Sequence, residues 1–379
     1  MKRSEQRILT THAGSLPRPD DLTELMFDVI DEKPLDQARL DARVQEAVRE
    51  VVQKQRDAGI DVISDGEMGK VGFSNYVLQR FSGFTARAQF MALDVAETPV
   101  LAGTIFGDRA SQHLRLPILD GPMEPRGRED IDREIEDFRA ALGDTDPDDA
   151  FICALTPGQV TFNFPNHFYG SHEAYLDAAA KALQPEYEAI VQAGFNLQLD
   201  SPDVAMACHC WTEGSDLKDW KAHIPASIEA LNGVIGGLPS DKVRFHVCWG
   251  NYRGPHHKDT PLRDLVEPVL KIHADFIYFE AANPQHEHEW EVWKDVKLPD
   301  DKALIPGVID TKTNHVEHPE LIAQRLERFA GVVGRERVIA GTDCGFATFV
   351  GWHSCEPEAA WLKLRALSDG AALASRKLW

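Results

Sequence analysis

The chain has 379 residues, of which 43% are hydrophobic and 27% are charged, so it can bury a large core and lacks the composition of a disordered protein. Its formal net charge of −21 disfavours non-specific binding to nucleic acid or to an anionic membrane surface. The N-terminal segment lacks the apolar run of a secretory signal, and no stretch is long and apolar enough for a membrane helix. We therefore expect a cytoplasmic protein with no nucleic-acid or membrane partner.

Short apolar runs alternate with longer segments of helical periodicity along the chain. The short runs are rich in β-branched residues, which predicts strands. The predicted strands are Ile8–Ser15, Asp61–Glu67, Phe151–Pro157, Asn196–Asp200, Arg244–Trp249, Phe276–Glu280, Leu304–Asp310 and Val338–Asp343. The predicted helices are Leu35–Ala58, His172–Ala193, Ser215–Ile235, Pro261–His273, His286–Asp295, Pro319–Val333 and Glu356–Leu373.

This alternation predicts βαβ units and a parallel sheet. Eight units favour a closed (β/α)8 TIM barrel formed by residues 1–379 as a single catalytic domain; an open doubly wound sheet is the alternative. The chain exceeds a minimal barrel of about 250 residues, and we assign the surplus to an insertion at residues 87–149, between the second and third strands. This insertion holds hairpin strands predicted at Ala88–Phe90 and Val100–Gly107, and it is either a lid or a packing element.

Ionisable residues gather at the predicted C-terminal ends of the strands, where barrel enzymes hold their active sites. His246 and Cys248 are two apart on the fifth strand and so share a face, Glu280 closes the sixth, and Cys344 follows the eighth. One imidazole, two thiols and one carboxylate form a ligand set that suits tetrahedral zinc. The sequence therefore predicts a Zn²⁺ site at this end of the barrel.

The remaining histidine and cysteine clusters are weaker candidates. The run Cys208–Cys210 has neighbours that face opposite sides of the chain, which favours a structural or pocket-lining role. Histidines that fall in polar loops or at helix starts are interpreted as solvated side chains: His256, His257, His286 and His288.

Several motifs, in order along nearly the whole chain, resemble those of the cobalamin-independent methionine synthase family. They are T-T-H-A-G-S-L-P-R-P near the start, S-D-G-E at the second strand, H-x-C at the fifth, the glutamate of the sixth and D-C-G at the eighth. The chain looks like the catalytic, C-terminal barrel of that enzyme and its shorter single-barrel relatives. The resemblance implies a zinc-dependent methyltransferase in which His246, Cys248, Glu280 and Cys344 bind zinc. It also implies that Gly14, Ser15, Glu67 and Asp200 hold an amino-acid thiol such as homocysteine.

The chain departs from that family pattern at three points. It has one predicted barrel where the full-length enzyme has two. Lys312 stands where the family has a proton-relaying histidine, and His315 follows three residues later, so we consider both for proton transfer. The residues after H-x-C also differ, and Trp249 and Tyr252 are candidates for stacking on a flat alkyl donor, with core packing as the alternative for Trp249.

These departures leave the substrates open. The single-barrel relatives include epoxyalkane:coenzyme M transferases, which open an epoxide with a zinc-bound thiolate. The coenzyme M sulfonate would need a cation such as Arg18, Lys70 or Arg253, whereas a homocysteine ammonium would need a carboxylate such as Glu67 or Asp200. The intact carboxylates favour the amino-acid thiol.

Other hypotheses concern the role of the metal and of the residues around the site. A non-catalytic zinc-binding protein and a zinc-free, decarboxylase-type relative remain as alternatives. Asp343 is a candidate for orienting His246. The expected partners are a small-molecule thiol and an alkyl donor, and a homo-oligomer is compatible with the sequence.

Overall fold

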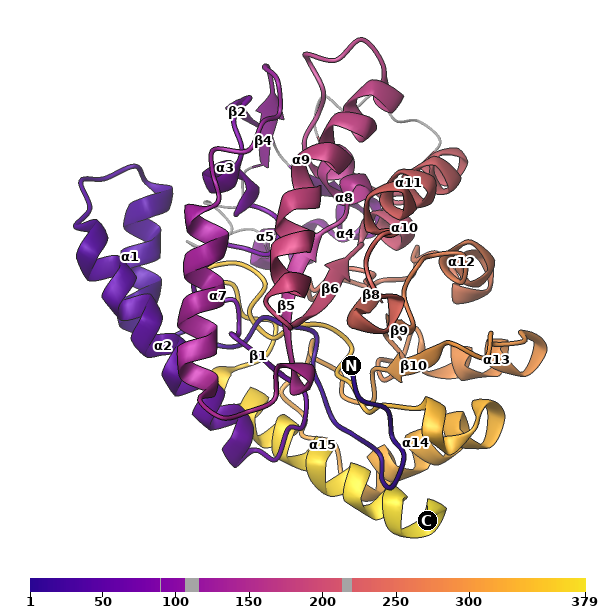
Figure 1. Ribbon diagram of the computed structural model, residues 1–379. Helices are drawn as coiled ribbons and strands as arrows, with labels where there is room; N and C mark the ends of the chain where they lie inside the picture. The colour runs from indigo at the N-terminus through magenta and orange to yellow at the C-terminus, as the bar shows by residue number, and fades with distance from the viewer. Residues whose placement is uncertain (89, 106–115, 213–219) are drawn as a thin grey trace.

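The computed structural model describes residues 1–88, 90–105, 116–212 and 220–379. Its centre is a six-stranded sheet in which all neighbouring strands are parallel (Figure 1). The strands lie in the order β1 (Ile63–Ser64), β5 (Ala150–Leu155), β6 (Asn196–Asp200), β8 (Val243–Val247), β9 (Phe276–Phe279) and β10 (Ala303–Pro306). Every residue of these strands is buried, as expected for a parallel sheet that is covered on both faces.

The segments predicted as the first and last strands run beside the edges of this sheet without forming regular strands. Single parallel bridges connect them to the sheet and to each other, pairing Leu304 with Val338, Ala340 with Thr10, and Thr11 with Val62. The predictions of regular strands at Ile8–Ser15 and Val338–Asp343 are therefore corrected to bridges. One physical reason is that the backbone N–H of Thr10 donates to the Asp61 carboxylate at 2.9 Å instead of to a neighbouring carbonyl.

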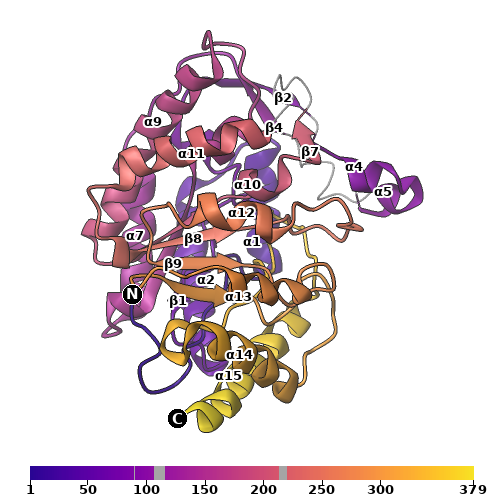
Figure 2. The same cartoon turned by 90° about the vertical axis from the view of Figure 1, so that its right-hand side faces the viewer.

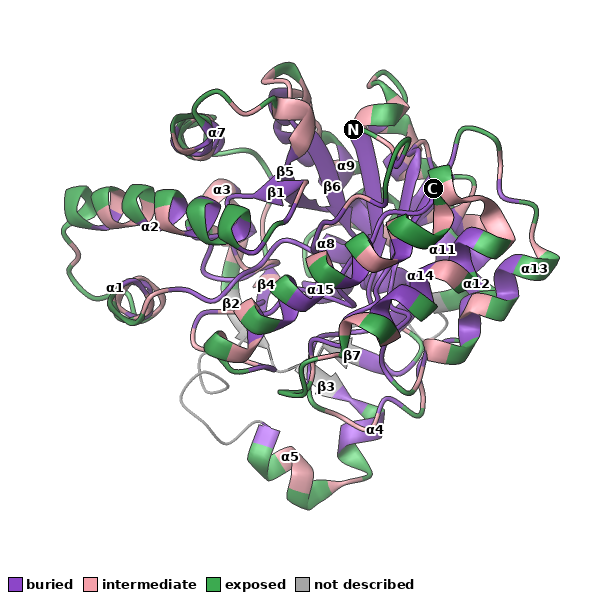
Figure 3. Cartoon of the chain, turned by 90° about the horizontal axis from the view of Figure 1, so that it is seen from below, coloured by how far each residue is buried: buried purple, intermediate pink, exposed green. Residues whose placement is uncertain are grey.

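Long helices cover the outside of the sheet (Figure 1, Figure 2). They are α1 (Asp20–Ile30), α2 (Gln37–Asp57), α7 (Glu129–Leu142), α9 (His172–Gln192), α11 (Trp220–Ile235), α12 (Leu262–Val269), α14 (Pro319–Val333) and α15 (Pro357–Leu378). Side chains fix where two of them begin, since Asp36 accepts the N–H of Arg39 at the start of α2 and Ser171 accepts that of Ala174 at the start of α9. Figure 3 shows buried faces turned toward the sheet and exposed faces turned outward.

Shorter elements complete the described chain. The short α-helices are α3 (Val77–Arg80), α4 (Leu93–Ala96), α5 (Pro99–Ile105), α8 (Pro157–Asn163), α10 (Asp203–Met206) and α13 (Val292–Asp295). The 3₁₀ helices are η1 (Pro147–Asp149), η2 (Ser240–Lys242), η3 (Glu287–Glu291) and η4 (Arg335–Arg337). The helix predicted at His286–Asp295 is divided into η3 and α13, and residues 215–219 of another predicted helix lie outside the described residues.

In the part of the predicted insertion that the structure describes, the strands pair with other partners than the expected hairpin. Strand β3 (Phe90–Ala92) pairs with β7 (Cys210–Thr212), and β2 (Phe84–Ala88) pairs with β4 (Leu116–Leu119), both antiparallel. The segment predicted as the strand Val100–Gly107 is helix α5 as far as Ile105, and residues 106–107 lie outside the described part. A helix can begin here because the proline at its first position has no N–H that would need an intrahelical acceptor.

Helix α7, within the predicted insertion, is a packing element. It packs against α2, and the Glu134 carboxylate on α7 lies 3.1 Å from the Lys70 ammonium. Both side chains are less than one-tenth exposed. None of the helices in the described ranges combines the length and apolar character that crossing a bilayer requires.

Candidate active site

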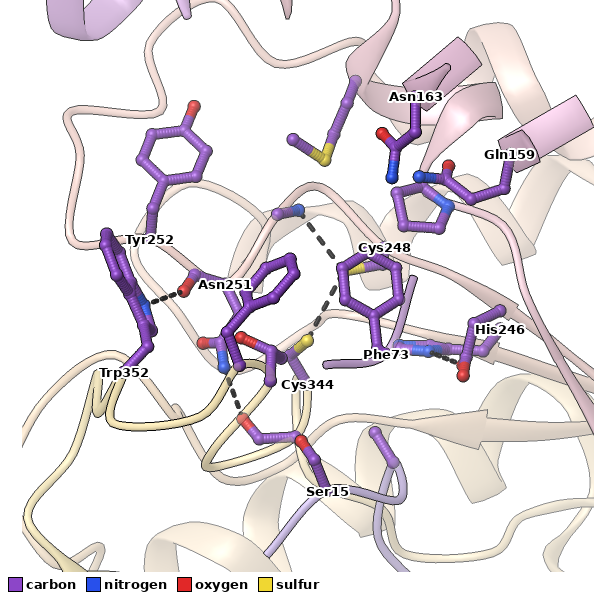
Figure 4. Close-up of a pocket in the computed structure, with 18 of the residues that line it drawn as sticks. Ser15, Phe73, Gln159, Asn163, His246, Cys248, Asn251, Tyr252, Cys344 and Trp352 are labelled. Atoms are coloured by element: carbon purple, nitrogen blue, oxygen red, sulfur yellow. Dashed lines mark hydrogen bonds and ion pairs between the residues drawn. The ribbon is translucent and has the colours of Figure 1, made fainter. Parts of the chain in front are cut away.

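A pocket lies where the parallel strands end, and most of the predicted site residues line it (Figure 4). The predicted residues in its wall are Ser15, Glu67, Asp200, His246, Cys248, Tyr252 and Cys344. Gly14 lies directly behind the wall, since a Cβ atom there would be 2.7 Å from Glu67 Oε1 and 2.5 Å from the sulfur of Cys153. The sequence thus located this pocket from residues far apart in the chain.

One imidazole and two thiols form a cluster in the pocket. The donor atoms of His246, Cys248 and Cys344 all lie within 4.8 Å of one another, and the two sulfurs are 3.4 Å apart. All three residues are buried. His246 Nδ1 makes a hydrogen bond of 2.8 Å with Asp200, whereas its Nε2 is buried without a hydrogen-bond partner. The cluster therefore offers one imidazole nitrogen and two sulfurs as ligand atoms for a metal ion.

The thiols of Cys248 and Cys344 share one hydrogen bond, which shifts their pKa values in opposite directions. The contact with Cys344 lowers the pKa of Cys248, and the His246 ring acts in the same direction. The same contact and burial raise the pKa of Cys344 well above its ordinary value. For His246, burial is the largest single influence and lowers the pKa, but the hydrogen bond to Asp200 and the nearby charges of Cys248, Asp200 and Glu280 together raise it above its ordinary value.

Glu280, predicted as the fourth ligand, lies beside the cluster with both oxygens engaged. Its Oε1 accepts the Trp249 N–H at 2.9 Å and lies 3.9 Å from the Cys248 sulfur. Its Oε2 accepts from Lys312 Nζ at 2.6 Å and from Asn283 Nδ2 at 2.8 Å. Burial alone would raise the pKa of Glu280, but the Lys312 ammonium holds it below its usual value. The structure thus brings three of the four predicted ligands together and holds the fourth in an ion pair.

Asp343 does not orient His246. Its carboxylate accepts the backbone N–H groups of residues 281–283 at 2.8 Å each, and Asp200 holds the imidazole instead. The expectation for Asp343 is corrected because its side chain faces the loop that follows β9. Burial raises the pKa of Asp343 to about 7.

A second cluster holds two carboxylates next to the first. Donor atoms of Glu67, Cys153 and Asp200 lie within 4.8 Å of one another. Glu67 has a φ of +58°, a left-handed conformation that is strained for a residue with a side chain and that often marks a functional site. Its Oε2 is buried without a hydrogen-bond partner, and burial raises the pKa of Glu67 to about 8. A cationic group bound in the pocket could therefore pair with the Glu67 carboxylate and stabilise its charged form.

The two aromatic candidates have different positions. Tyr252 lines the pocket, and its hydroxyl donates to Asp94 at 2.8 Å. Trp249 is fully buried, its Nε1 donates to the carbonyl of Thr260 at 2.7 Å, and its ring packs on His286 with 4.3 Å between the centroids. Trp249 therefore occupies the core, and Tyr252 has the place expected of a group that contacts a substrate.

The proton-transfer candidates are not in the pocket wall. Lys312 is ion-paired to Glu280, and its side chain is 9% exposed. His315 is exposed, and its backbone carbonyl accepts from Lys363. Neither residue is among the described residues that line the pocket.

The candidate sulfonate-binding cations are also placed elsewhere. The guanidinium of Arg18 is buried and donates to the backbone carbonyls of Ala347, Glu67 and Lys70. The ammonium of Lys70 donates to the carbonyl of Cys153 at 2.6 Å, and Arg253 is exposed. Arg18 and Lys70 thus stabilise the backbone around the second cluster.

Two of the histidines interpreted as solvated are buried instead. His256 and His286 both contact the Asp259 carboxylate, at 2.9 and 3.0 Å, and His209 lies 3.3 Å from it. His257 and His288 are exposed, as expected. The correction has a physical reason: the side chain of Asp259 is fully covered, so its carboxylate needs the hydrogen bonds that His256 and His286 provide.

Sequence reasoning missed several polar and aromatic residues of the pocket. They are Gln159, Phe162, Asn163, Asn251, Phe349 and Trp352. The amides come from helix α8 and from the loop after β8, neither of which carries a motif. The aromatic-rich run that follows D-C-G, F-A-T-F-V-G-W, was the available signal for the last two.

A family model described as the catalytic domain of cobalamin-independent synthase matches residues 8–115 and 168–362. The chain belongs to this family. The resemblance inferred from its motifs is thereby confirmed. The family model does not match residues 116–167, which overlap the predicted insertion.

Several relatives are similar over most of the chain. One is a 2-hydroxypropyl-CoM lyase from Xanthobacter autotrophicus, 24% identical, with 98% of this chain and 96% of that protein covered. A methionine synthase from Sulfurisphaera tokodaii is 26% identical, with 89% and 85% covered. A 5-methyltetrahydropteroyltriglutamate–homocysteine methyltransferase from Yersinia enterocolitica is 24% identical over 94% of this chain, which spans 42% of that longer protein.

The fold is also similar to solved structures. A B12-independent methionine synthase from Shewanella sp. W3-18-1, solved in complex with selenomethionine, gives a TM-score of 0.74 at 21% identity, with 98% of this chain and 99% of that chain covered. A protein described as a vitamin-B12-independent methionine synthase from Listeria monocytogenes gives 0.65 at 19% identity. This likeness establishes the fold.

Proposed function

We propose that the protein is a zinc-dependent enzyme that alkylates the thiol of an amino-acid substrate such as homocysteine, in a methionine synthase-like reaction. The observation that carries the proposal is the presence of two clusters in one pocket. His246, Cys248 and Cys344 offer ligands of the kind that bind zinc, and Glu67 and Asp200 offer carboxyl groups a short distance away. An amino-acid thiol could place its sulfur at the first cluster and its ammonium at the second.

The residues present fit a zinc ion. The free Nε2 of His246 is the atom that a metal would bind, because Nδ1 already contacts Asp200, an arrangement typical of zinc-binding histidines. Two thiolates would neutralise the charge of a divalent ion, so excess negative charge would lie on an added substrate sulfur. When bound, zinc supplies the positive charge that keeps a sulfur ligand deprotonated at neutral pH. A pocket wall with an open ligand position favours a catalytic over a structural metal.

The second cluster favours an amino-acid thiol over a sulfonate thiol. Glu67 and Asp200 face the pocket, whereas neither lysine nor arginine occurs among the described residues that line it. An ammonium group would provide the missing partner for Glu67 Oε2. A sulfonate would face the two carboxylates instead, and burial makes like charges costly.

In this reaction the chain positions and activates the thiol. Glu67 and Asp200 orient the substrate through its ammonium, and Asp200 at the same time holds the His246 ring. Lys312 holds the Glu280 carboxylate beside Cys248 and so limits its access to the ligand position. We reassign Lys312 from proton transfer to this positioning role.

The single bridges at the sheet edges support the proposal of a closed (β/α)8 barrel built from one domain, residues 1–379. They link the segment around Thr10 to the segment after β10 on one side and to β1 on the other. A closed ring would explain why the site residues, which come from both ends of the sequence, converge at one mouth.

Metal analysis and a binding assay test this function together. We expect about one zinc ion per chain in the wild type and in Cys208→Ser, an exposed-thiol control, and loss of zinc in Cys344→Ser. Calorimetry on the zinc-loaded protein should show binding of homocysteine and at least tenfold weaker binding of coenzyme M. Equal zinc in all three proteins would contradict the metal assignment. Binding of coenzyme M but not of homocysteine would support the epoxide-opening alternative.

A further inference from the structure

We infer that the alkyl donor of this enzyme is a small onium compound, a methyl sulfonium or a quaternary ammonium, held by aromatic side chains of the pocket. The inference rests on the proposed thiol alkylation and names the class of the second substrate. Three features of the described pocket carry it: its aromatic wall, the sign of its charge, and the positions of its potential proton donors.

Aromatic rings form a large part of the wall. They belong to Phe73, Phe162, Tyr252, Phe349 and Trp352. Phe73 and Phe349 meet edge to face with 5.3 Å between centroids. In Figure 4, Tyr252 and Trp352 lie together on one side of Asn251, and the Phe73 ring lies in front of Cys248. Rings around a space are the usual means by which proteins bind sulfonium and quaternary ammonium groups, because the ring faces carry partial negative charge.

The charge of the pocket wall also disfavours an anionic alkyl donor. The carboxylates in the described pocket wall are those of Glu67 and Asp200. The described residues of this wall include no lysine or arginine. A donor with a polyglutamate tail or a phosphate would therefore meet negative charge and rings without a cationic partner. A methyl group on a cationic centre would be attracted by the rings, while the two carboxylates pair with the ammonium of the thiol substrate.

The third feature is the leaving group. In transfer from a sulfonium, the thiolate electron pair forms the new carbon–sulfur bond, the old carbon–sulfur bond breaks, and a neutral thioether departs without needing a proton. A pterin amine or an epoxide oxygen would leave with negative charge and would need an acid. Lys312 is bound to Glu280 and His315 is exposed, so neither candidate acid is in the described wall. The onium reaction also neutralises opposite charges, which an apolar pocket favours.

Binding of non-reactive probes tests the donor site without turnover. We use choline and its neutral isostere 3,3-dimethylbutan-1-ol, which differ in charge but little in shape. Calorimetry on the zinc-loaded protein should show at least tenfold tighter binding of choline. Trp352→Leu should abolish that difference and Trp352→Phe should retain it, whereas Phe168→Leu, an exposed aromatic outside the pocket wall, should behave as the wild type. Equal binding of the two probes to the wild type would overturn the inference.

A turnover assay is the second test of the inference. Homocysteine is incubated with S-methylmethionine, dimethylsulfoniopropionate or glycine betaine, and in parallel with methyltetrahydrofolate, methylcobalamin or epoxypropane, and methionine or the thioether product is measured. We expect turnover with an onium donor and a rise of at least tenfold in its KM in Trp352→Leu, with the KM for homocysteine unchanged. Methylation of bound homocysteine by folate or cobalamin alone would overturn the inference and leave the proposed function intact. Failure of homocysteine to bind at all would instead overturn the proposed function.

Discussion

Replacing Lys312 by methionine removes the ammonium that contacts the fully buried carboxylate of Glu280. The Nζ–Oε2 distance of 2.6 Å corresponds to a gross attraction of about 6 kcal/mol at an effective dielectric constant near 20. Removing one partner of such a pair typically costs about 3–5 kcal/mol, because the other charge stays buried. Trp249 N–H and Asn283 still donate to Glu280, so we expect a loss near the lower limit, about 3 kcal/mol.

Thermal unfolding followed by circular dichroism measures this loss. Lys312→Met should lower Tm by about 3–5 °C at neutral pH, because the entropy of unfolding scales with the length of the chain. Lys258→Met is the matched control, since Lys258 pairs with the half-exposed Glu97 and its loss should cost less than about 1 kcal/mol. In Lys312→Met combined with Glu280→Gln, part of the stability should return because no charge is left unpaired. Additivity of the two changes within about 0.5 kcal/mol would refute the reasoning.

The pair also makes a signed prediction for pH. Lys312 holds the pKa of Glu280 below its ordinary value of 4.5, so its stabilisation is present above that value and is lost as the pH falls through the lower, folded-state pKa. The difference in stability between wild type and Lys312→Met should therefore shrink on acidification. A difference that stays constant down to the onset of acid unfolding would contradict this sign.

Three further predictions concern the neighbouring clusters. Asp200→Asn weakens the acceptor for His246 Nδ1, and we expect about 10- to 100-fold weaker zinc binding in competition with a chromophoric chelator; unchanged affinity would exclude the orienting role. Glu67 has its pKa raised to about 8 by burial, so homocysteine affinity measured by calorimetry should rise with pH toward 8, and Glu67→Gln should lower the affinity and reduce that rise. Burial opposes protonation of His286, but its hydrogen bonds to Asp259 and Glu289 raise its pKa from 6.5 to about 9. Its stabilisation is therefore present below pH 6.5 and lost as the pH rises through about 9, and Asp259→Asn should flatten this part of the urea-unfolding profile while the exposed control His257→Gln should not.

The sequence by itself determined the family, the parallel α/β class and most of the pocket. Strand ends of a parallel sheet meet at one edge, so spacing alone was enough to place His246 and Cys248 on one face and Cys344 near them. Most of the long helices were also predicted, since amphipathic periodicity is a local property, but α1 and α7 were missed.

The tertiary structure alone decided which partner each buried charge takes. Glu280 lies directly after its strand, which is the position expected of a zinc ligand. However, Lys312, 32 residues later in the sequence, donates to its carboxylate. Asp343 contacts the backbone after β9, and Asp259 gathers His256 and His286 from separate loops. Burial requires every such charge to find a partner, and the choice depends on loop paths that have no periodicity in the sequence. The positions of the candidate ligands and of the aromatic side chains in the pocket wall follow from those paths.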